Sequence, residues 1–309
     1  MIKIVDNSVE GSGINNYSKF LLEFLKDRYE VEYENIYYKN KDHFYINAVK
    51  SRLKYSLSRA EGDLGIFSNF LAVDRRFKHE ILVVHDTFLW KYGSLYQKAF
   101  FFMLNIFNNM ERVYVSRTTR DRYTYNKEER VIYPFLYESF YHARHFHGQG
   151  YVLTDYGNYP NKDPEYYMKV YKNNDDMKFV KLGFPIEMHN LFSPGFIEMS
   201  EIFYNYMNAD FLLFLSRDEG FGYPMAQAGL IGLPVVLRDN EITREIYGEA
   251  KYYDNDVIGD NFKINREIIQ DLIEDRQYLQ DKRNEILERI NPFLQIEKWS
   301  DLINQVMKE

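Results

Sequence analysis

The sequence of 309 residues contains no cysteine and no apolar run long enough to cross a membrane. Without cysteine there can be no disulfide framework, so nothing in the composition points to secretion. A membrane-spanning helix needs about 20 mainly apolar residues in a row. Met1 leads directly into the apolar stretch Ile2 to Val5, and no positively charged and apolar signal region precedes it. We therefore expect a soluble, cytoplasmic protein.

An excess of positive charge is also lacking. The chain carries 39 Lys and Arg against 46 Asp and Glu, a net charge of −7. No motif combines basic and aromatic residues, so nucleic acid is not an expected partner. The charge is uneven, because Met1 to His147 holds 22 basic and 18 acidic residues (+4) and the remainder 17 and 28 (−11). A basic first half fits peripheral contact with a lipid surface or an anionic acceptor, although scattered Lys and Arg on solvated helix faces explain it more simply.

Hydrophobic residues make up 45% of the chain and charged residues 28%, which is typical of globular proteins. The length fits two domains of about 150 residues each. We place them at 1–147 and 148–290, with a linker around the His-rich segment 142–150 and a closing segment at 291–309.

Apolar segments alternate with amphipathic ones, which predicts α/β architecture with parallel sheets covered by helices on both faces. The predicted strands are Ile2–Val5, Leu64–Phe67, Ile81–Val84, Val113–Val115, Tyr151–Thr154, Phe179–Leu182, Phe211–Leu215 and Val235–Leu237. The predicted helices are Asn15–Asp27, Leu95–Asn109, Pro164–Tyr171 and Pro224–Leu230, followed by charged helices from Asn265.

The run EGFGYPMAQAGLIGLPVV, Glu219 to Val236, is the most informative part of the chain. An apolar strand leads into a Gly-Phe-Gly turn, Pro224 opens a helix rich in small residues, and a second apolar strand follows Gly232. Glycines let the backbone approach a ligand closely, and a helix N-terminus offers N–H groups and partial positive charge to a phosphate. A carboxylate at Glu219 suits the hydroxyls of a sugar.

This block resembles the donor-binding signature of the retaining glycosyltransferases of family 4. The resemblance extends along nearly the whole chain, through the segments GSGINNYSKFLLEFL, ILVVHDTFLWKYG, RVYVSRTTRDRY, SPGFIEMSEIFYNYMNADFLLFLS, REIYGEAKYYD and the closing INPFLQIEKWSDLINQVMKE. It implies a GT-B fold, in which two Rossmann-like domains with parallel sheets face each other across a cleft and a C-terminal helix crosses back to the first domain.

The implied activity is transfer of a sugar from a nucleotide-diphosphate sugar to an acceptor hydroxyl, with retention of configuration and without a metal ion or other cofactor. The acceptor can be a sugar, a lipid or a protein. In the family, the carboxylate that corresponds to Glu219 holds the donor's sugar hydroxyls. The backbone of the turn lies against the sugar and the diphosphate, which places three further donor-binding residues here: Gly220, Phe221 and Gly222.

The other implied catalytic residues are Lys162 and His85. Lys162 stands where the family lysine stabilises the charge that develops on the leaving phosphate. His85, at the end of a predicted strand, matches the histidine that faces the donor sugar, although a histidine at such a position is often a structural hydrogen-bonding residue. The arginine that accompanies the family lysine is absent, and Asn158 stands near its place.

Two further positions bear on donor binding. Gln227, eight positions after Glu219, occupies the place of a second family carboxylate that accepts hydrogen bonds from the ribose, and an amide has half the acceptor capacity and no charge. Gly11 and Gly13 follow the first strand and resemble the family's loop over phosphate and acceptor. Taken alone, this Gly-x-Gly is weak evidence for a dinucleotide site, because Asn16 stands in the place of the third glycine.

Several alternatives stay open. His142, His145 and His147 are compatible with a metal site, but a solvated cluster in a linker explains them better. The apolar run Phe101 to Met110 suits a buried helix better than a membrane-dipping one. A nucleotide-sugar epimerase of the same fold, or a non-catalytic module that only binds nucleotide sugars, would share most of the motifs.

Overall fold

The computed structural model describes residues 1–10, 12–37, 62–69, 77–86, 95, 98, 110–124 and 128–308. The chain forms two compact units, Met1–Phe135 together with Ile290–Glu309, and Leu136–Arg289. The division predicted after residue 147 therefore falls inside the second unit. Gly11 and almost all of the predicted helix Leu95–Asn109 lie outside the described residues, as does the run Phe101 to Met110 apart from its last residue.

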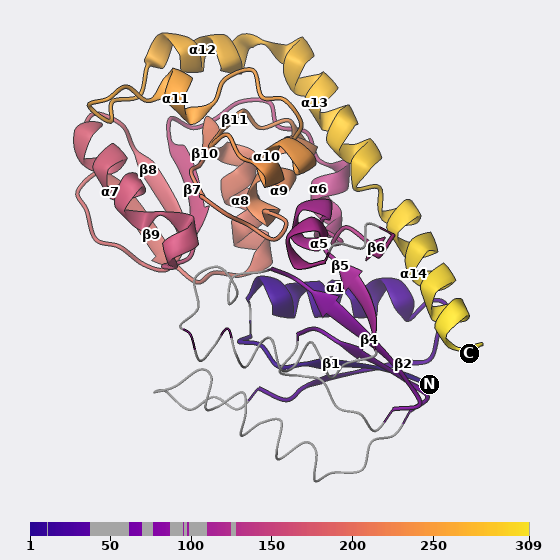
Figure 1. Cartoon of the computed structure of the whole chain (residues 1–309). Coiled ribbons are helices and arrows are strands. Elements are labelled where there is room, and N and C mark those ends of the chain that lie inside the picture. Colours follow the sequence, from indigo (N-terminus) through magenta and orange to yellow (C-terminus); the bar gives the residue numbers. More distant parts are fainter. Residues whose placement is uncertain are drawn as a thin grey trace. The chain divides into compact units, whose positions relative to one another are not determined.

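The first unit is built on a six-stranded parallel sheet in the order β2-β1-β3-β4-β5-β6 (Figure 1). The three central strands are buried along most of their length, as their Val-, Ile- and Leu-rich sequences predict for a sheet covered on both faces. The strands are β1 (Ile2–Asp6), β2 (Val31–Asn35), β3 (Leu64–Phe67), β4 (His79–Val84), β5 (Glu111–Tyr114) and β6 (Arg130–Val131).

Helix α1 (Gly13–Leu25) begins at Ser12, whose side chain accepts a hydrogen bond from the backbone N–H of Asn15. Tyr17, Leu21 and Leu25 recur every four residues and form its buried stripe. A second helix, α5 (Arg117–Tyr123), is capped in the same way by Ser116.

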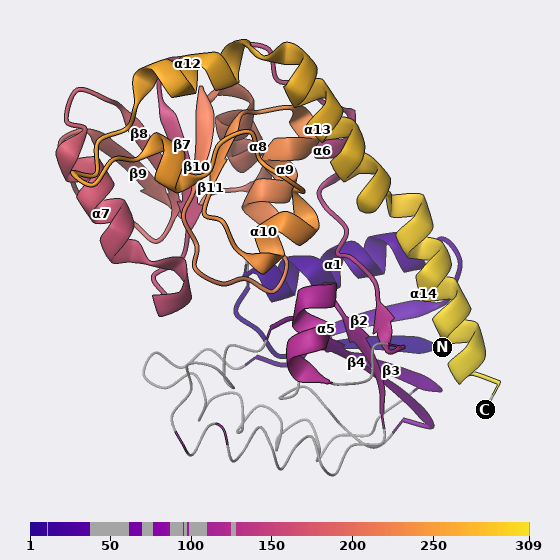
Figure 2. The same ribbon diagram turned by 45° about the horizontal axis from the view of Figure 1, so that its top comes forward.

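The C-terminal helix α14 (Pro292–Val306) packs within the first unit. Asn291 caps it and Trp299 is fully buried on its inner face. The side-chain oxygen of Gln295 accepts a hydrogen bond of 3.1 Å from the backbone N–H of Tyr133, and Arg28, just beyond α1, donates to Ser300 at 3.1 Å. Figure 2 shows α14 beside the end of α1.

The second unit holds a five-stranded parallel sheet in the order β11-β10-β7-β8-β9. Its strands are β7 (Val152–Tyr156), β8 (Phe179–Gly183), β9 (Leu191–Gly195), β10 (Phe211–Phe214) and β11 (Val235–Leu237). Its helices are α6 (Glu138–His142), η1 (Pro160–Lys162, a single 3₁₀ turn), α7 (Pro164–Asn173), α8 (Met199–Asn208), α9 (Tyr223–Ile231), α10 (Glu241–Ile246), α11 (Asp254–Val257), α12 (Arg266–Glu274) and α13 (Arg276–Arg289).

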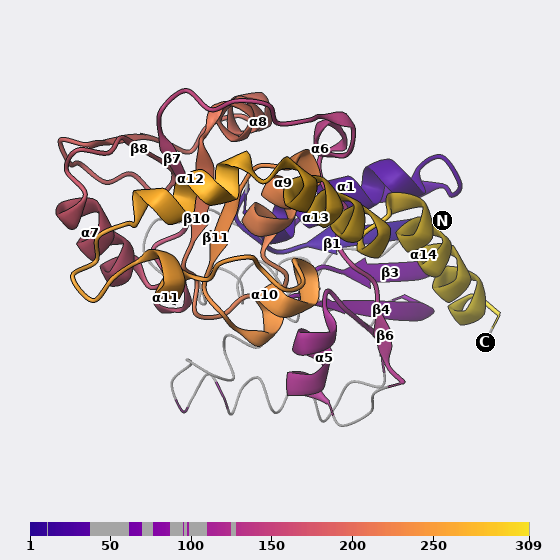
Figure 3. The ribbon, with the colours of Figure 1, turned by 90° about the horizontal axis from the view of Figure 1, so that it is seen from above.

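Helix α9 is buried nearly all round, which agrees with its sequence of small and apolar residues. It lies along α13, as Figure 3 shows. The close approach requires Gly229, because a Cβ atom there would lie 2.2 Å from Cδ1 of Ile286 on α13.

The predicted α/β architecture with parallel sheets is confirmed. All eight predicted strands are present, and β3 and β11 have the predicted bounds. The three strands that were not predicted are β2, β6 and β9, each at the edge of its sheet. Within the described ranges, no helix is long and apolar enough to cross a membrane.

Candidate functional site

The candidate site lies where the strand order of the second sheet reverses. From β7 the chain continues to β8 on one side, whereas from β10 it continues to β11 on the other side. In open α/β sheets, ligands bind outside the carboxyl ends of the two strands that flank such a point. Lys162 and Glu219, predicted from the sequence as catalytic, lie in the loops that follow β7 and β10.

Backbone hydrogen bonds hold these two loops together. The carbonyl oxygen of Asn161 accepts hydrogen bonds from the N–H groups of Arg217 and Asp218, at 2.8 and 3.3 Å. In return, the side-chain amide of Asn161 donates to the carbonyl oxygen of Asp218 at 2.9 Å. The residues on either side of these contacts, Lys162 and Glu219, are therefore kept opposite each other.

Lys162 and Glu219 form an ion pair. The Lys162 ammonium donates to both carboxylate oxygens of Glu219, with a distance of 2.5 Å to Oε2. The Glu219 side chain is 9% exposed and that of Lys162 21% exposed, so the pair is partly shielded from water. The structure thus brings together two of the three predicted catalytic side chains, one from each loop.

A second charged group, which sequence reasoning missed, stabilises the same loops. Asp163 is buried and has left-handed backbone geometry, with φ of 53°. Its Oδ2 accepts hydrogen bonds from Nε of Arg217 at 2.7 Å and from Nη1 of Arg238 at 2.9 Å. Arg238 also lies 3.6 Å from Oδ2 of Asp254. The sequence signal that could have revealed this group is the position of Arg217 and Arg238, which follow closely after β10 and β11.

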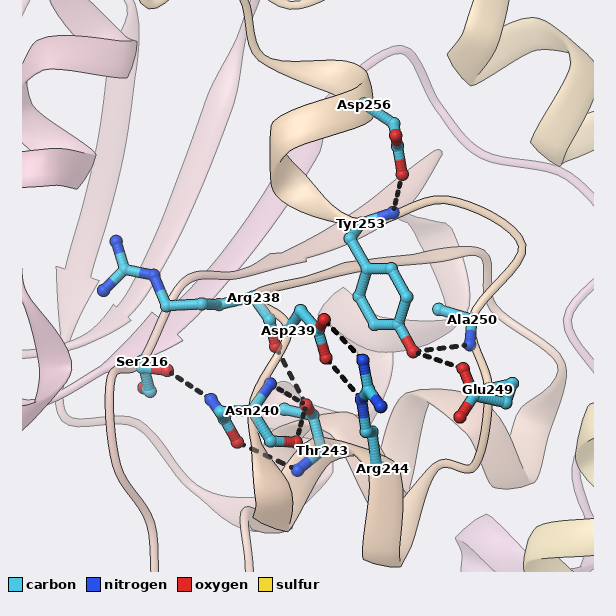
Figure 4. A network of polar contacts seen from close by, with 10 residues as sticks. All are labelled: Ser216, Arg238, Asp239, Asn240, Thr243, Arg244, Glu249, Ala250, Tyr253 and Asp256. Atoms are coloured by element: carbon cyan, nitrogen blue, oxygen red, sulfur yellow. Dashed lines mark hydrogen bonds and ion pairs between the residues drawn. The ribbon is translucent and has the colours of Figure 1, made fainter.

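The loop after β11 is tied to the same edge of the sheet (Figure 4). Asn240 caps α10, where its side chain accepts from the N–H of Thr243 at 3.0 Å, and its amide donates to the carbonyl oxygen of Ser216 at 3.2 Å. Arg244 forms a two-pronged contact with Asp239, at 2.6 and 2.7 Å. These contacts connect the loops that follow β10 and β11.

Two ionisable groups, Asp155 and the buried Lys181, lie on the adjoining strands. Burial raises the pKa of Asp155 on β7, whose carboxylate accepts a hydrogen bond of 2.9 Å from the Tyr206 hydroxyl. Burial lowers the pKa of Lys181 on β8 to about 8. The Lys181 ammonium donates to the carbonyl oxygens of Tyr156 and Leu182, both at 3.2 Å, and to that of Phe184. Lys181 therefore satisfies carbonyl groups at the carboxyl ends of β7 and β8.

Asn158 lies in the loop after β7, as predicted, and lines a pocket of about 250 Å³. The pocket is mainly apolar, with Lys181 and Asn158 as its polar members. Its other lining residues are Tyr156, Pro164, Met168, Phe184 and Ile186.

The glycine turn leads directly into α9. Gly222 is the N-cap, with φ of 84°, and no side chain caps the helix. A Cβ atom at Gly222 would lie 2.5 Å from Cε of Met225, so both the backbone angle and the packing require glycine. Phe221 is buried at 3% exposure, whereas Gly220 is partly exposed. The turn therefore brings backbone, rather than side chains, to the start of the helix.

Two buried polar residues lie close to this turn. Gln227, on the second turn of α9, is 5% exposed. The Ser216 hydroxyl, after β10, is fully buried and has no hydrogen-bond partner among the described residues. Buried polar groups in native proteins are nearly always paired, so unpaired ones indicate a place where a ligand or water contributes.

The remaining predicted residues belong to the first unit. His85 follows β4, and burial lowers its pKa to about 3, so the imidazole is neutral at physiological pH. Its ring makes an edge contact with the ring of Tyr17 at 4.6 Å, and its Nε2 is buried without a hydrogen-bond partner among the described residues. Gly13 is exposed at the start of α1.

The first sheet has its own reversal point, between β1 and β3, and a buried carboxylate lies there. Asp6, the last residue of β1, is fully buried and accepts hydrogen bonds from four neutral donors. These are Ser8 at 2.6 Å, Ser68 at 2.7 Å, Asn15 at 2.9 Å and Tyr33 at 3.2 Å. Sequence reasoning missed this cluster, although an acidic residue that ends a buried strand was the available signal.

The prediction of a solvated histidine cluster is wrong for one of its three members. His142 and His147 are exposed, but His145 is buried and its Nε2 lies 2.8 Å from the carbonyl oxygen of Ala209. Its backbone N–H donates to the carbonyl of Ile231, so this segment is packed within the second unit. In the described ranges, no three His, Asp or Glu side chains are placed to hold a metal ion.

Sequence comparisons match no protein-family model and no curated protein. Solved structures match in three dimensions at low identity. Sucrose-phosphate synthase from Thermosynechococcus elongatus matches with a TM-score of 0.73 at 13% identity, over 100% of this chain and 100% of that chain. HepE from Anabaena, solved with UDP-glucose, gives 0.68 at 15% identity, over 98% and 99%. WaaG, a glycosyltransferase of lipopolysaccharide biosynthesis, gives 0.60 at 12% identity, over 98% and 99%.

At these identities the similarity concerns the fold. The chain has the α/β fold of the GT-B glycosyltransferases, with two sheets of parallel strands and their covering helices.

Proposed function

We propose that the protein is a retaining glycosyltransferase of the family 4 type, which moves a sugar from a nucleotide-diphosphate sugar to an acceptor hydroxyl. The observation that carries the proposal is the Lys162–Glu219 pair, which lies at the reversal point of the second sheet beside the glycine turn that opens α9. The similarity to sucrose-phosphate synthase and to HepE, which was solved with UDP-glucose, supports a nucleotide sugar as the donor.

The two charged side chains suit the two ends of such a donor. The Lys162 ammonium stabilises the negative charge that develops on the leaving diphosphate, together with the N-terminus of α9. The Glu219 carboxylate accepts hydrogen bonds from the hydroxyls of the transferred sugar. In the transfer, the bond between the anomeric carbon and the phosphate oxygen breaks and a bond to the acceptor oxygen forms on the same face. The acceptor proton passes to the departing phosphate, so no metal ion or other cofactor takes part.

His85 contributes as a neutral imidazole in this proposal, because its pKa of about 3 excludes an imidazolium at working pH. A neutral ring can accept or donate one hydrogen bond to a sugar hydroxyl, and the buried Nε2 has that capacity unused among the described residues. Gln227, which is 5% exposed on α9, offers the ribose one carbonyl oxygen in place of a carboxylate. The backbone of Gly220 and Gly222 and the side chain of Asn158 complete the proposed donor site.

A module that binds nucleotide sugars without catalysis is the second candidate. It is favoured by one observation, the presence of a neutral Gln227 where the resembling enzymes carry a second carboxylate. The two candidates differ in turnover and share donor binding, so donor binding is the first property to measure.

Thermal unfolding against a panel of uridine, guanosine, adenosine and thymidine diphosphates and their sugars tests the proposal. A ligand at a hundredfold excess over its dissociation constant stabilises the folded state by about 2.7 kcal/mol. We expect one base to give this stabilisation, and we expect it to persist in EDTA. If no nucleotide or nucleotide sugar raises the unfolding temperature, both candidates fail.

A further inference from the structure

Lys162 and Glu219 bind each other, although the proposed donor would need both of these side chains. In the part of the chain that the structure describes, Lys162 has no other side-chain partner, and neither has Glu219. The contacts of Asn161 hold the two loops together, and with the loops in this arrangement the side chains of Lys162 and Glu219 meet. A ligand that takes Lys162 must therefore leave Glu219 without its counter-charge.

The energetic consequence follows from burial. Separating a largely buried ion pair is unfavourable if one charge is left unpaired, and much less so if both charges find new partners. Glu219 is the more buried member, at 9% exposure, so its carboxylate is the one that loses most when Lys162 turns to a phosphate. Hydroxyl groups can replace the ammonium as hydrogen-bond donors to that carboxylate.

We propose that this ion pair makes the site select the intact nucleotide sugar over the nucleoside diphosphate, an inference that rests on the proposed function. The intact donor supplies phosphate oxygens to Lys162 and sugar hydroxyls to Glu219, so both charges keep partners. The nucleoside diphosphate supplies phosphate oxygens and no transferred sugar, so the pair competes with it for Lys162. Once the sugar has been transferred, re-formation of the pair favours release of the nucleoside diphosphate.

The test compares two dissociation constants by calorimetry on the full chain, for a nucleoside diphosphate and its sugar. The probes are UDP with UDP-glucose, GDP with GDP-mannose, ADP with ADP-glucose and dTDP with dTDP-glucose, and the couple that binds is used. We expect the wild type to bind the sugar form more tightly by about tenfold. In Glu219→Gln, which frees Lys162 and keeps the side-chain shape, we expect the diphosphate to bind about tenfold more tightly and the preference to disappear.

The matched control is Asp176→Asn, which removes one negative charge from the same unit at the exposed pair with Arg266. This variant should keep the wild-type ratio, which separates the effect of the pair from a general loss of negative charge. If Glu219→Gln does not fold, Glu219→Asp shortens the side chain, weakens the pair and should shift the ratio in the same direction. Binding by the wild type with an unchanged ratio in the folded variant overturns the inference alone, whereas no binding of any couple overturns the proposed function as well.

Discussion

Each sheet of the protein has a buried or partly buried carboxylate at the point where its strand order reverses, and the two carboxylates are partnered in opposite ways. Asp6 in the first sheet is fully buried and, among the described residues, accepts hydrogen bonds from neutral groups alone, which come from β2, α1 and the loops after β1 and β3. Glu219 in the second sheet is partly accessible, and its partner is the cationic Lys162.

The difference separates a structural role from a binding role. Four donors from separate elements use the hydrogen-bonding capacity of Asp6, so the group joins β1, β2, β3 and α1 and has none left for a ligand. The Lys162–Glu219 pair joins two loops that hydrogen bonds of Asn161 also hold together. A ligand that separates the pair leaves those hydrogen bonds in place. Two carboxylates at equivalent points of the two sheets can therefore have different roles. The groups that each carboxylate contacts determine its role.

The largest expected effect is on the stability that Asp6 provides. Asp6→Ala leaves several buried donors unpaired and should lower the free energy of unfolding by about 4 kcal/mol. Asp63→Ala is the control, because the Asp63 side chain is 60% exposed and its carboxylate pairs with the N-terminal ammonium, and it should cost less than about 0.5 kcal/mol. Urea denaturation measures both. Equal small losses would show that the cluster around Asp6 does not stabilise the fold.

The next effect concerns activity. Lys162→Ala removes the ammonium that is proposed to stabilise the leaving diphosphate and should lower the turnover of the folded protein about a hundredfold. Lys172→Ala, at an exposed position on α7, should have wild-type turnover. We expect the same loss of turnover in Glu219→Ala, because this variant lacks the carboxylate proposed to bind the sugar hydroxyls. A Lys162→Ala protein that transfers sugar at the wild-type rate would remove this residue from the mechanism.

The pH dependence of stability probes His85, the third residue of the proposed catalytic set. His85 has a pKa of about 3 in the folded state, below the ordinary value of 6.5. The unfolded state therefore binds the proton first, and stability that is fully present above pH 6.5 is lost as the pH falls from 6.5 towards 3, by at most about 1.4 kcal/mol per pH unit. His85→Phe should flatten this part of the curve. An NMR titration that gives His85 a pKa near 6.5 would contradict the burial of its imidazole.

The smallest expected effect is on nucleotide binding, at the position where family 4 glycosyltransferases carry a second carboxylate. If Gln227 lies against the ribose, Gln227→Glu should tighten nucleotide binding by about fivefold, because charge-assisted hydrogen bonds exceed neutral ones by roughly 1 kcal/mol. Gln277→Glu, at an exposed position of α13, adds the same charge away from the site and should not tighten binding. Weaker binding of every nucleotide by a folded Gln227→Glu protein would place the ribose elsewhere.

The strands that sequence reasoning found and missed differ in burial. The central strands are continuous apolar runs, and these signal a buried strand clearly. The missed strands β2, β6 and β9 lie at sheet edges and are only partly buried. In β2 apolar and polar residues alternate, β6 has two residues, and β9 contains Pro194. What makes a short polar segment a strand is the neighbour it pairs with, which a local pattern does not contain.

The site shows the same limit. Lys162 and Glu219 were predictable because each lies in a motif that follows a strong strand signal, and the sheet order then brings the motifs together. The contacts of Asp163 were not predictable, because its partners Arg217 and Arg238 lie 54 and 75 residues away in the sequence. His145 was misjudged because it lies in a His-rich segment that was interpreted as a linker, whereas its ring contacts the carbonyl group of the distant Ala209.

The central claim is that a nucleotide-diphosphate sugar binds at the carboxyl edge of β7 and β10 by replacing the Lys162–Glu219 contact. A crystal structure of the full chain with the nucleotide sugar identified by thermal unfolding tests it most directly. The account predicts a phosphate oxygen within about 3 Å of the Lys162 ammonium, sugar hydroxyls against the Glu219 carboxylate and the ion pair separated. A nucleotide sugar bound away from this edge, with the ion pair intact, would contradict the account.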